Sequence, residues 1–112
     1  METIKGYVRF VPTMNFTSNA TAISKFAIYD TEEKDYKSKV HCVAWEDVAE
    51  GCHNKIGEGD IVYAKGYFKD VEFTAKDGKL VKMKQFTCKK VFVDMLDGTF
   101  GDVTDSEFRP TW

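Results

Sequence analysis

SKVHCVAWEDVAEGCHNKIGEGDIVYAKGYF, residues 38–68, decides the fold, because its side-chain pattern changes from strand to helix and back to strand. Residues 38–45 alternate with period two, which is typical of a strand. Residues 46–56 begin with acidic side chains and then place apolar residues three or four positions apart, which predicts a short helix. A GEGD turn follows, and residues 60–75 return to a strand pattern. The residues expected to face the core are Val40, Cys42 and Ala44 in the strand and Val48, Ala49 and Cys52 in the helix.

Three further strand patterns flank this segment, at residues 3–11, 21–30 and 79–94. The last of them and the strand at 60–75 are both long, and the Asp-Gly dipeptide between them is a strong signal for a hairpin. Gly66, inside the first strand of this hairpin, predicts a bulge or a sharp bend.

The order of elements is therefore three strands, a short helix, a long bent strand, a hairpin turn and a final strand. Five strands with a helix between the third and the fourth match the OB fold, a partly open Greek-key barrel, although a generic five-stranded α+β domain would give the same order. We expect an all-β, five-stranded OB-fold barrel with one short helix between its third and fourth strands and a long hairpin joining the fourth and fifth. The domain is expected to span residues 1–94, and the weak pattern of residues 95–112 predicts a short, partly disordered tail.

The composition stands out in its aromatic content rather than in its charge. Aromatic residues make up 14% of the 112-residue chain, more than a core of this size requires, so some of them must lie at a surface or an interface. The 16 basic and 18 acidic residues nearly balance, which is not the bulk signature of a nucleic-acid binder. Any nucleic-acid binding must therefore depend on a local arrangement of lysines.

Other functional classes find little support in the sequence. Three cysteines without a signal peptide or a long apolar run favour reduced thiols in a cytoplasmic protein with no membrane segment. The pairs His41-Cys42 and Cys52-His53 lack the spacing of zinc ligands, which favours core positions for these cysteines. We also find no arrangement of carboxylates, nucleophiles or phosphate-binding glycines that indicates catalysis. We therefore expect no enzyme activity, no cofactor and no metal.

Four short motifs occur in order along residues 2–94. GYVRFVPTMNFTSNATAISKF (6–26) has the form of a first β-hairpin, and VAWEDVAE (43–50) that of a strand–helix junction with an aromatic residue. GEGDIVYAKGYF (57–68) contains a Gly-x-x-Val-Tyr-x-x-Gly step, and FTAKDGK (73–79) has an aromatic residue before an Asp-Gly turn. Together these motifs resemble the bacterial and phage-type single-stranded DNA-binding protein (SSB) family.

This resemblance implies an OB fold, a homo-oligomer (a tetramer or a dimer) and no catalysis. It implies sequence-tolerant binding and protection of single-stranded DNA in replication, recombination or repair, with replication proteins as further partners. The family's long Gly/Pro/Gln-rich tail with an acidic end is absent from the sequence. That departure and the near-neutral charge favour an alternative, a primosome-type OB-fold module that acts mainly through protein partners.

The candidate site residues follow from what a single strand offers. Its bases expose apolar faces on which an aromatic ring can stack, with a value of roughly 1–3 kcal/mol per base, and its phosphates require cations. Trp45 and Phe73 are the first candidates because they match aromatic positions of the family, although core packing and hairpin packing are the competing interpretations. Alternation points Tyr29 outward together with Lys25. The complete set expected to bind single-stranded DNA is Trp45, Phe73, Tyr29, Tyr36, Phe16, Tyr67, Lys25, Lys39, His41, Lys69, Lys76, Lys79, Lys82 and Lys84.

Overall fold

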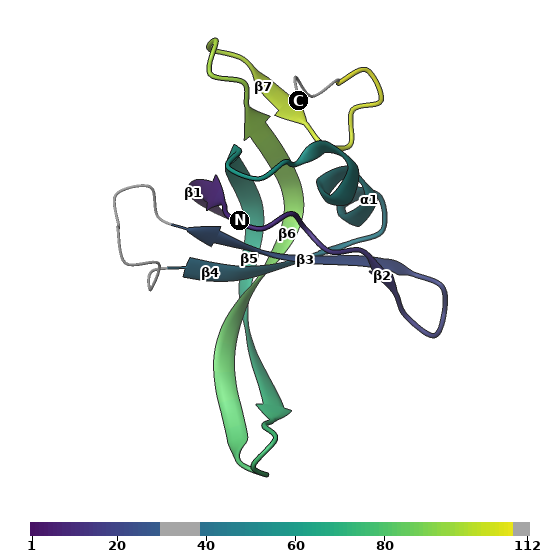
Figure 1. Cartoon of the computed structure of the whole chain (residues 1–112), viewed down its shortest axis with the longest axis vertical. Coiled ribbons are helices and arrows are strands. Elements are labelled where there is room, and N and C mark those ends of the chain that lie inside the picture. Colours follow the sequence, from purple (N-terminus) through teal and green to yellow (C-terminus); the bar gives the residue numbers. More distant parts are fainter. Residues whose placement is uncertain (30–38, 109–112) are drawn as a thin grey trace.

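The computed structural model describes residues 1–29 and 39–108, and this part of the chain consists of strands with one short helix (Figure 1). The predicted strands and helix are present, with ends shifted by a few residues, and β2 and β7 are additional short strands. The residues between the predicted strands at 21–30 and 38–45 lie outside the described part of the chain. The elements are β1 (Glu2–Val8), β2 (Asn15–Phe16), β3 (Ala22–Tyr29), β4 (Lys39–Trp45), α1 (Glu46–Lys55), β5 (Ile61–Thr74), β6 (Leu80–Asp94) and β7 (Phe100–Asp102).

The strands form one sheet that closes on itself as a ring. β1 pairs with β5, β5 with β6 and β4 with β3, all antiparallel, while β6 and β4 pair in parallel. The ring is completed where β1 returns to β3, with Tyr7 opposite Tyr29 and Val8 opposite Ile28. β2 extends the sheet beside β3, and β7 extends it beside β6. The prediction of an all-β chain with one short helix is confirmed at this level.

The interior of the ring holds the hydrophobic core, and α1 packs against it. Alternation that points Lys25 and Tyr29 outward turns Ala22, Ser24, Phe26 and Ile28 inward, and all four are buried. From the helix, Ala49 and Cys52 are fully buried and Val48 packs partly against the core. This end of the molecule is tightly filled, since a Cβ on the helical Gly51 would lie 2.3 Å from the carbonyl oxygen of Val103.

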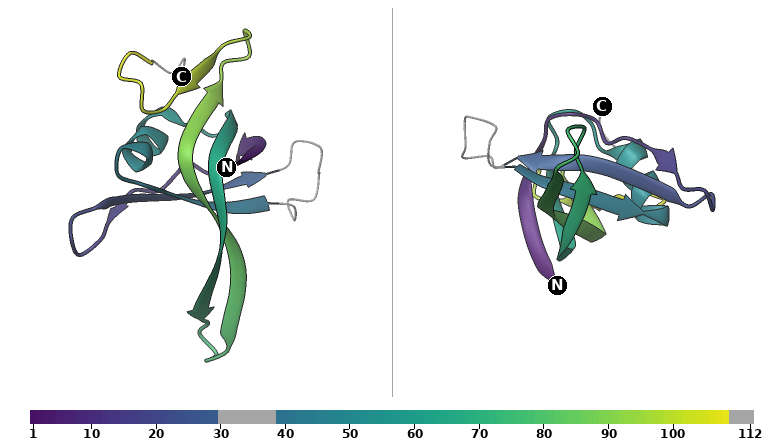
Figure 2. Two further views of the ribbon diagram at one scale, coloured as in Figure 1. Left: turned by 180° about the vertical axis from the view of Figure 1, so that it is seen from behind. Right: turned by 90° about the horizontal axis from the view of Figure 1, so that it is seen from below.

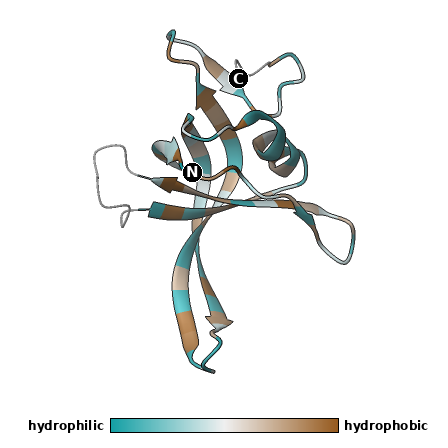
Figure 3. Cartoon of the chain, in the orientation of Figure 1, coloured by the Kyte–Doolittle hydropathy of each residue, from teal (hydrophilic) through white to brown (hydrophobic). Residues whose placement is uncertain are grey.

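β5 and β6 continue beyond the ring as a long two-stranded hairpin (Figures 1 and 2). The pairing register shifts between Lys65 and Gly66, as the glycine predicted. A Cβ at Gly66 would lie 1.8 Å from the carbonyl oxygen of Thr87, so only glycine permits this approach of the two backbones. We call residues 69–85 of this hairpin the arm. Hydrophilic and hydrophobic residues alternate along it (Figure 3), which gives the arm two chemically different faces.

The segment after residue 94, for which the sequence predicts a partly disordered tail, packs on the ring as far as residue 108. β7 pairs with β6, and Val103 and Phe108 are buried members of the core. The Phe108 ring covers Gly101, where an added Cβ would lie 2.5 Å from ring atoms. The folded domain therefore extends to Phe108. The apolar residues of this segment are spaced too irregularly to produce a strand or helix pattern in the sequence.

Candidate nucleic-acid interface

The side of the sheet that points away from the core carries many of the predicted site residues. Residues directly opposite each other on paired strands share a face of the sheet. Phe26 and Cys42 form such a pair in the core, so the neighbouring pairs, Lys25 with Val43 and Ala27 with His41, face outward. We call this side the outer face.

β6 and β5 continue the outer face beyond β4. Thr87 of β6 pairs with Val43 on one side and with Tyr67 of β5 on the other. Every second residue of the arm then shares this orientation, including Lys69, which lies opposite Gln85. The predicted site residues that the strand register assigns to the outer face are Trp45, Lys25, His41, Lys39, Tyr67, Lys69, Phe73 and Tyr29.

A groove of about 540 Å³ lies where the outer face of β3 and β4 meets the arm. Lys25 and His41 line it from the sheet, and Phe73 lines it from the arm, with 47% of the phenylalanine exposed. The groove thus brings together a cation, an imidazole and an aromatic ring from three strands. Its remaining lining residues are Val71, Glu72, Met83 and Gln85.

Trp45 lies on the same outer face at the end of β4 and is 42% exposed, so it is not sealed in the core. It also occupies the N-cap position of α1, where Ser, Thr, Asp or Asn is usual, and makes no side-chain capping bond within the described chain. The next residue, Glu46, has φ of 56°, a left-handed conformation that costs a non-glycine residue roughly 1–2 kcal/mol. The backbone is therefore strained at Glu46, where β4 joins α1, directly after the tryptophan whose indole ring is exposed to solvent.

For Tyr29 the structure corrects the expected exposure of the ring. It lies on the outer face, as alternation predicted, but it is only 4% exposed. The ring of Tyr7 from β1 stacks on it, with centroids 5.5 Å apart and an interplanar angle of 24°. Lys39 Nζ lies 5.8 Å from the centroid of the same ring. Closure of the ring by β1 covers Tyr29, so it has no free face for a base.

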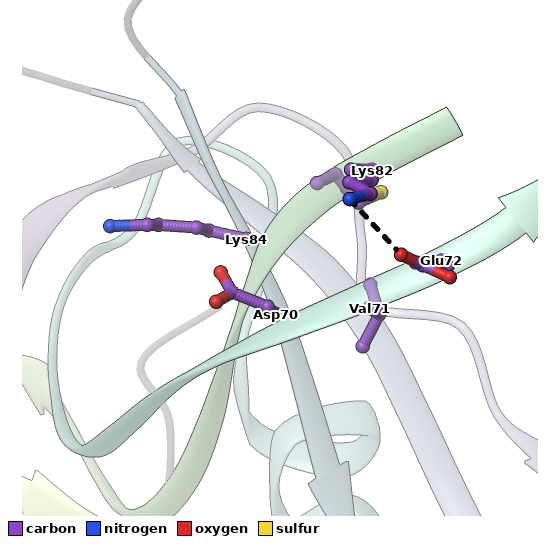
Figure 4. Close-up of a pocket in the computed structure, with 6 residues that line it drawn as sticks. Asp70, Val71, Glu72, Lys82 and Lys84 are labelled. Carbon is purple, nitrogen blue, oxygen red and sulfur yellow. Dashed lines mark ion pairs between the residues drawn. The ribbon is translucent and has the colours of Figure 1, made fainter. Parts of the chain in front are cut away.

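The arm has a reverse face on which charges balance (Figure 4). Lys82 Nζ lies 3.5 Å from Glu72 Oε1, and Lys84 pairs in register with Asp70. These four residues lie on the face opposite to Phe73, because their positions alternate with its own. They line a second pocket of about 490 Å³. Lys82 and Lys84 do not line the groove, but their pocket shares Val71, Glu72 and Met83 with it, and both lysines have carboxylates beside them.

The other predicted residues lie away from the groove. Phe16 is 64% exposed, but it pairs with the core residue Ala22 and so lies on the side of the sheet opposite to Trp45. Lys76 and Lys79 are exposed at the tip of the arm, beside a turn in which Asp77 Oδ1 accepts a bond from the Lys79 backbone N–H. Tyr36 lies outside the described residues.

Sequence reasoning missed further residues that the arm contributes to the groove. Apolar Val71 and Met83 and polar Gln85 line it together with Phe73. The signal was available, because the Asp-Gly turn sets Thr74 opposite Leu80 and hence Phe73 opposite Val81. Counting in steps of two from that pair identifies every residue on Phe73's face.

The cysteines offer no reactive group to this interface. Cys42, Cys52 and Cys88 are free and buried. A hydrogen bond with Cys88, together with burial, raises the pKa of the Cys42 thiol, and burial raises that of Cys52. Both therefore remain protonated at neutral pH. Among residues 1–29 and 39–108, no group of three or more His, Cys, Asp or Glu could hold a metal ion.

Comparisons with known proteins do not add a family to this picture. No protein-family model matches the chain, and no curated protein matches it significantly. Within the described part of the chain, no helix combines the length and the apolar character needed to cross a membrane. Function must therefore be inferred from the ring, the arm and the groove between them.

Proposed function

We propose that this chain is an OB-fold protein that binds and protects single-stranded DNA without catalysis and without strong sequence preference. The observation that carries the proposal is the groove in which half-exposed Phe73 lies with Lys25 and His41. A ring and a cation in one open groove match the two chemical features that a single strand presents, namely base faces and phosphates.

The arrangement of strands supports the OB-fold part of the proposal. β1, β3, β4, β6 and β5 form a closed ring, and α1 lies between the third and fourth of these strands along the chain. The order around the ring is not sequential, as a Greek-key connection requires. OB folds bind oligonucleotides on one sheet face and between loops that flank it, and the arm occupies such a flanking position.

Binding would proceed by stacking and charge neutralisation. Phe73, Trp45 and Tyr67 each keep about half of their surface exposed on the outer face, and every base has an apolar face to place on such a ring. Lys25 and Lys69 are exposed on the same face and would neutralise phosphates. Because stacking does not distinguish bases, the resulting preference for sequence is weak.

The charge distribution makes this binding salt-sensitive. The whole chain has a net charge of −2, and Glu72 lines the groove together with Lys25. Long-range attraction to a polyanion is therefore small, and local lysine contacts supply the electrostatic contribution. Such contacts weaken as salt rises, because the counterions released on binding then return to a more concentrated solution.

A second candidate function is a primosome-type OB-fold module that acts mainly through protein partners. The charge-balanced reverse face of the arm favours it, since Lys82 and Lys84 lie beside Glu72 and Asp70 and are less available to phosphates. Under this alternative the exposed rings would contact another protein. Oligonucleotides would then bind this chain no more tightly than they bind an unrelated acidic protein.

Fluorescence titration separates the two functions. The chain contains two tryptophans, so a Trp112→Phe variant leaves Trp45 as the single indole. We expect saturable quenching of Trp45 by dT oligomers at low salt, and little quenching by a duplex of the same length. Absence of quenching and of any binding of labelled dT at low salt would exclude the single-strand function and leave the protein-partner module.

A further inference from the structure

A basic cluster lies where the ring ends and the arm begins, and none of its residues belongs to the site predicted from the sequence. The pairing of β5 with β6 shifts at this point. Lys65 lies opposite Lys90, whereas the next residue of β5, Gly66, lies opposite Cys88. Lys89 is left without an opposite residue, as the extra residue of a β-bulge is. We call Lys65, Lys89 and Lys90 the bulge cluster.

The bulge turns two consecutive lysines of β6 toward solvent. Cys88 and Val91 are buried, yet Lys89 and Lys90 between them are both exposed. A regular strand would turn one of these two side chains into the core, because successive side chains point to opposite faces. Lys65 is exposed as well and lies directly opposite Lys90. Three ammonium groups therefore gather on the outer face.

No carboxylate balances these charges. Like charges directly opposite each other on paired strands destabilise a sheet, and Lys65 and Lys90 are such a pair. Within residues 1–29 and 39–108, no member of the bulge cluster forms an ion pair. Asp102 of β7 lies opposite Phe92, but its Oδ1 accepts bonds from the backbone N–H and the hydroxyl of Thr104. The same hairpin pairs lysines with carboxylates on the reverse face of the arm, so the unbalanced charge is particular to the bulge.

The outer face of β5 connects the bulge cluster to the groove. Lys65, Tyr67 and Lys69 occupy successive outward positions of this strand, so about 13 Å separates the first from the last. Lys69 lies opposite Gln85, which lines the groove. Tyr67 between the two lysines is 50% exposed. A half-exposed ring thus lies between the groove and the bulge cluster.

The other side of β6 brings Trp45 toward the same cluster. The parallel register of β4 and β6 ends at the pair of Ala44 and Cys88. The residues that follow this pair along the two strands are Trp45 and Lys89. The bulge cluster is therefore flanked by exposed rings on both of the strands that neighbour β6.

We propose that the bulge cluster binds phosphates of the single strand that the groove receives, and that the strand continues from the groove past Tyr67 to these lysines. The inference rests on the proposed function and extends the binding surface beyond the groove. An anionic ligand relieves the repulsion between Lys65 and Lys90. The flanking rings select a single strand over an acidic protein segment, because a strand carries a base face beside every phosphate.

Removal of charge at the bulge cluster tests the proposal. The affinity for a labelled dT oligomer of about 16 nucleotides, the upper end of the site sizes of OB folds, is measured by fluorescence anisotropy. The variants are K65Q, K89Q/K90Q and K89R/K90R. With a salt slope of about 0.7 per phosphate, one lost contact weakens binding about eightfold at about 50 mM salt relative to about 1 M. We therefore expect about eightfold weaker binding for K65Q and at least about tenfold for K89Q/K90Q.

The arginine variant is the matched control, since it changes the same two side chains and keeps both charges. We expect its affinity to stay within about threefold of wild type. The losses of K65Q and K89Q/K90Q should shrink as salt rises, because less free energy is gained by releasing counterions into a concentrated solution. Circular dichroism monitors folding, and K65Q, on the strand without the extra residue, keeps the test decisive if K89Q/K90Q disturbs the bulge.

The outcomes separate this inference from the proposed function. If the wild-type chain binds dT and both glutamine variants bind it equally well, the inference is overturned, the proposed function stands, and the cluster is left to an acidic protein partner. A loss that K89R/K90R shares, or that does not shrink with salt, also overturns the inference, because charge is then not its cause. A wild-type chain that binds no dT at low salt overturns both.

Discussion

Replacing Phe73 by alanine is the sharpest test of the proposed function, because it removes a ring from the groove at little cost to the fold. Full burial of a phenylalanine contributes about 1.5–3 kcal/mol, and Phe73 is 47% exposed on an arm outside the core, so the loss of stability should be about 1 kcal/mol. A stacked base is worth roughly 1–3 kcal/mol, which corresponds to about 5- to 150-fold weaker binding. The assay is fluorescence anisotropy of labelled dT oligomers at low salt, which does not depend on Trp45.

Leu80→Ala is the matched control for this variant. Leu80 is also an exposed apolar residue of the arm, at 62%, but it pairs with Thr74 and so lies on the reverse face. We expect its affinity for dT to change by less than about twofold, since no base stacks there. If Phe73→Ala binds dT as tightly as wild type, or if Leu80→Ala loses as much affinity, then the groove does not bind the strand and the reasoning is refuted.

Three further expectations follow from the same structure. If Lys25, Lys39 and Lys69 each neutralise one phosphate, log affinity for dT should fall with log salt at a slope of about −2, and a slope near zero would exclude the lysine contacts. Tyr29→Ala should destabilise the domain by about 3 kcal/mol in urea denaturation, because the ring is buried against β1, whereas half-exposed Tyr67→Ala should cost about 1 kcal/mol. The three cysteines are each at most 3% exposed, so Ellman's reagent should label them only after denaturation, and rapid labelling of the native chain would contradict their placement.

Alternation carried most of the information about the fold. In β3 it identified the buried face correctly, and in β4 it placed Cys42 and Ala44 in the core. The bend at Gly66 was also predictable, since a glycine within a strand marks a place where backbones approach. These successes share a cause: each depends on residues close in sequence, whose side-chain directions follow from strand geometry alone.

The errors concern what covers a side chain, which local pattern does not specify. Tyr29 points outward as predicted, yet it is buried because Tyr7 arrives from a distant strand when the ring closes. Val103 and Phe108 joined the core from a segment without any periodic pattern. Both outcomes depend on long-range pairing, and a direction inferred from alternation does not reveal whether another strand will lie over it.

The structure divides the predicted site residues between two faces for a related reason. Composition and resemblance selected Phe73 and the lysines of the arm together, but a two-stranded hairpin has two faces and divides them. Lys82 and Lys84 are on the face opposite to Phe73, where the carboxylates of Glu72 and Asp70 lie beside them. Register, rather than composition, decides which cations can act with which rings.

This division bears on the binding role that we propose for the arm. An isolated two-stranded hairpin is only marginally stable, and the arm extends beyond the ring that would otherwise support it. Opposite-charge pairs across strands contribute roughly 0.2–1 kcal/mol each, and the arm places the Glu72–Lys82 pair on its reverse face. Stabilisation that comes from this face does not require the rings of the other face to be buried. Phe73 can therefore remain half exposed beside Lys25, as the proposed stacking of a base on its ring requires.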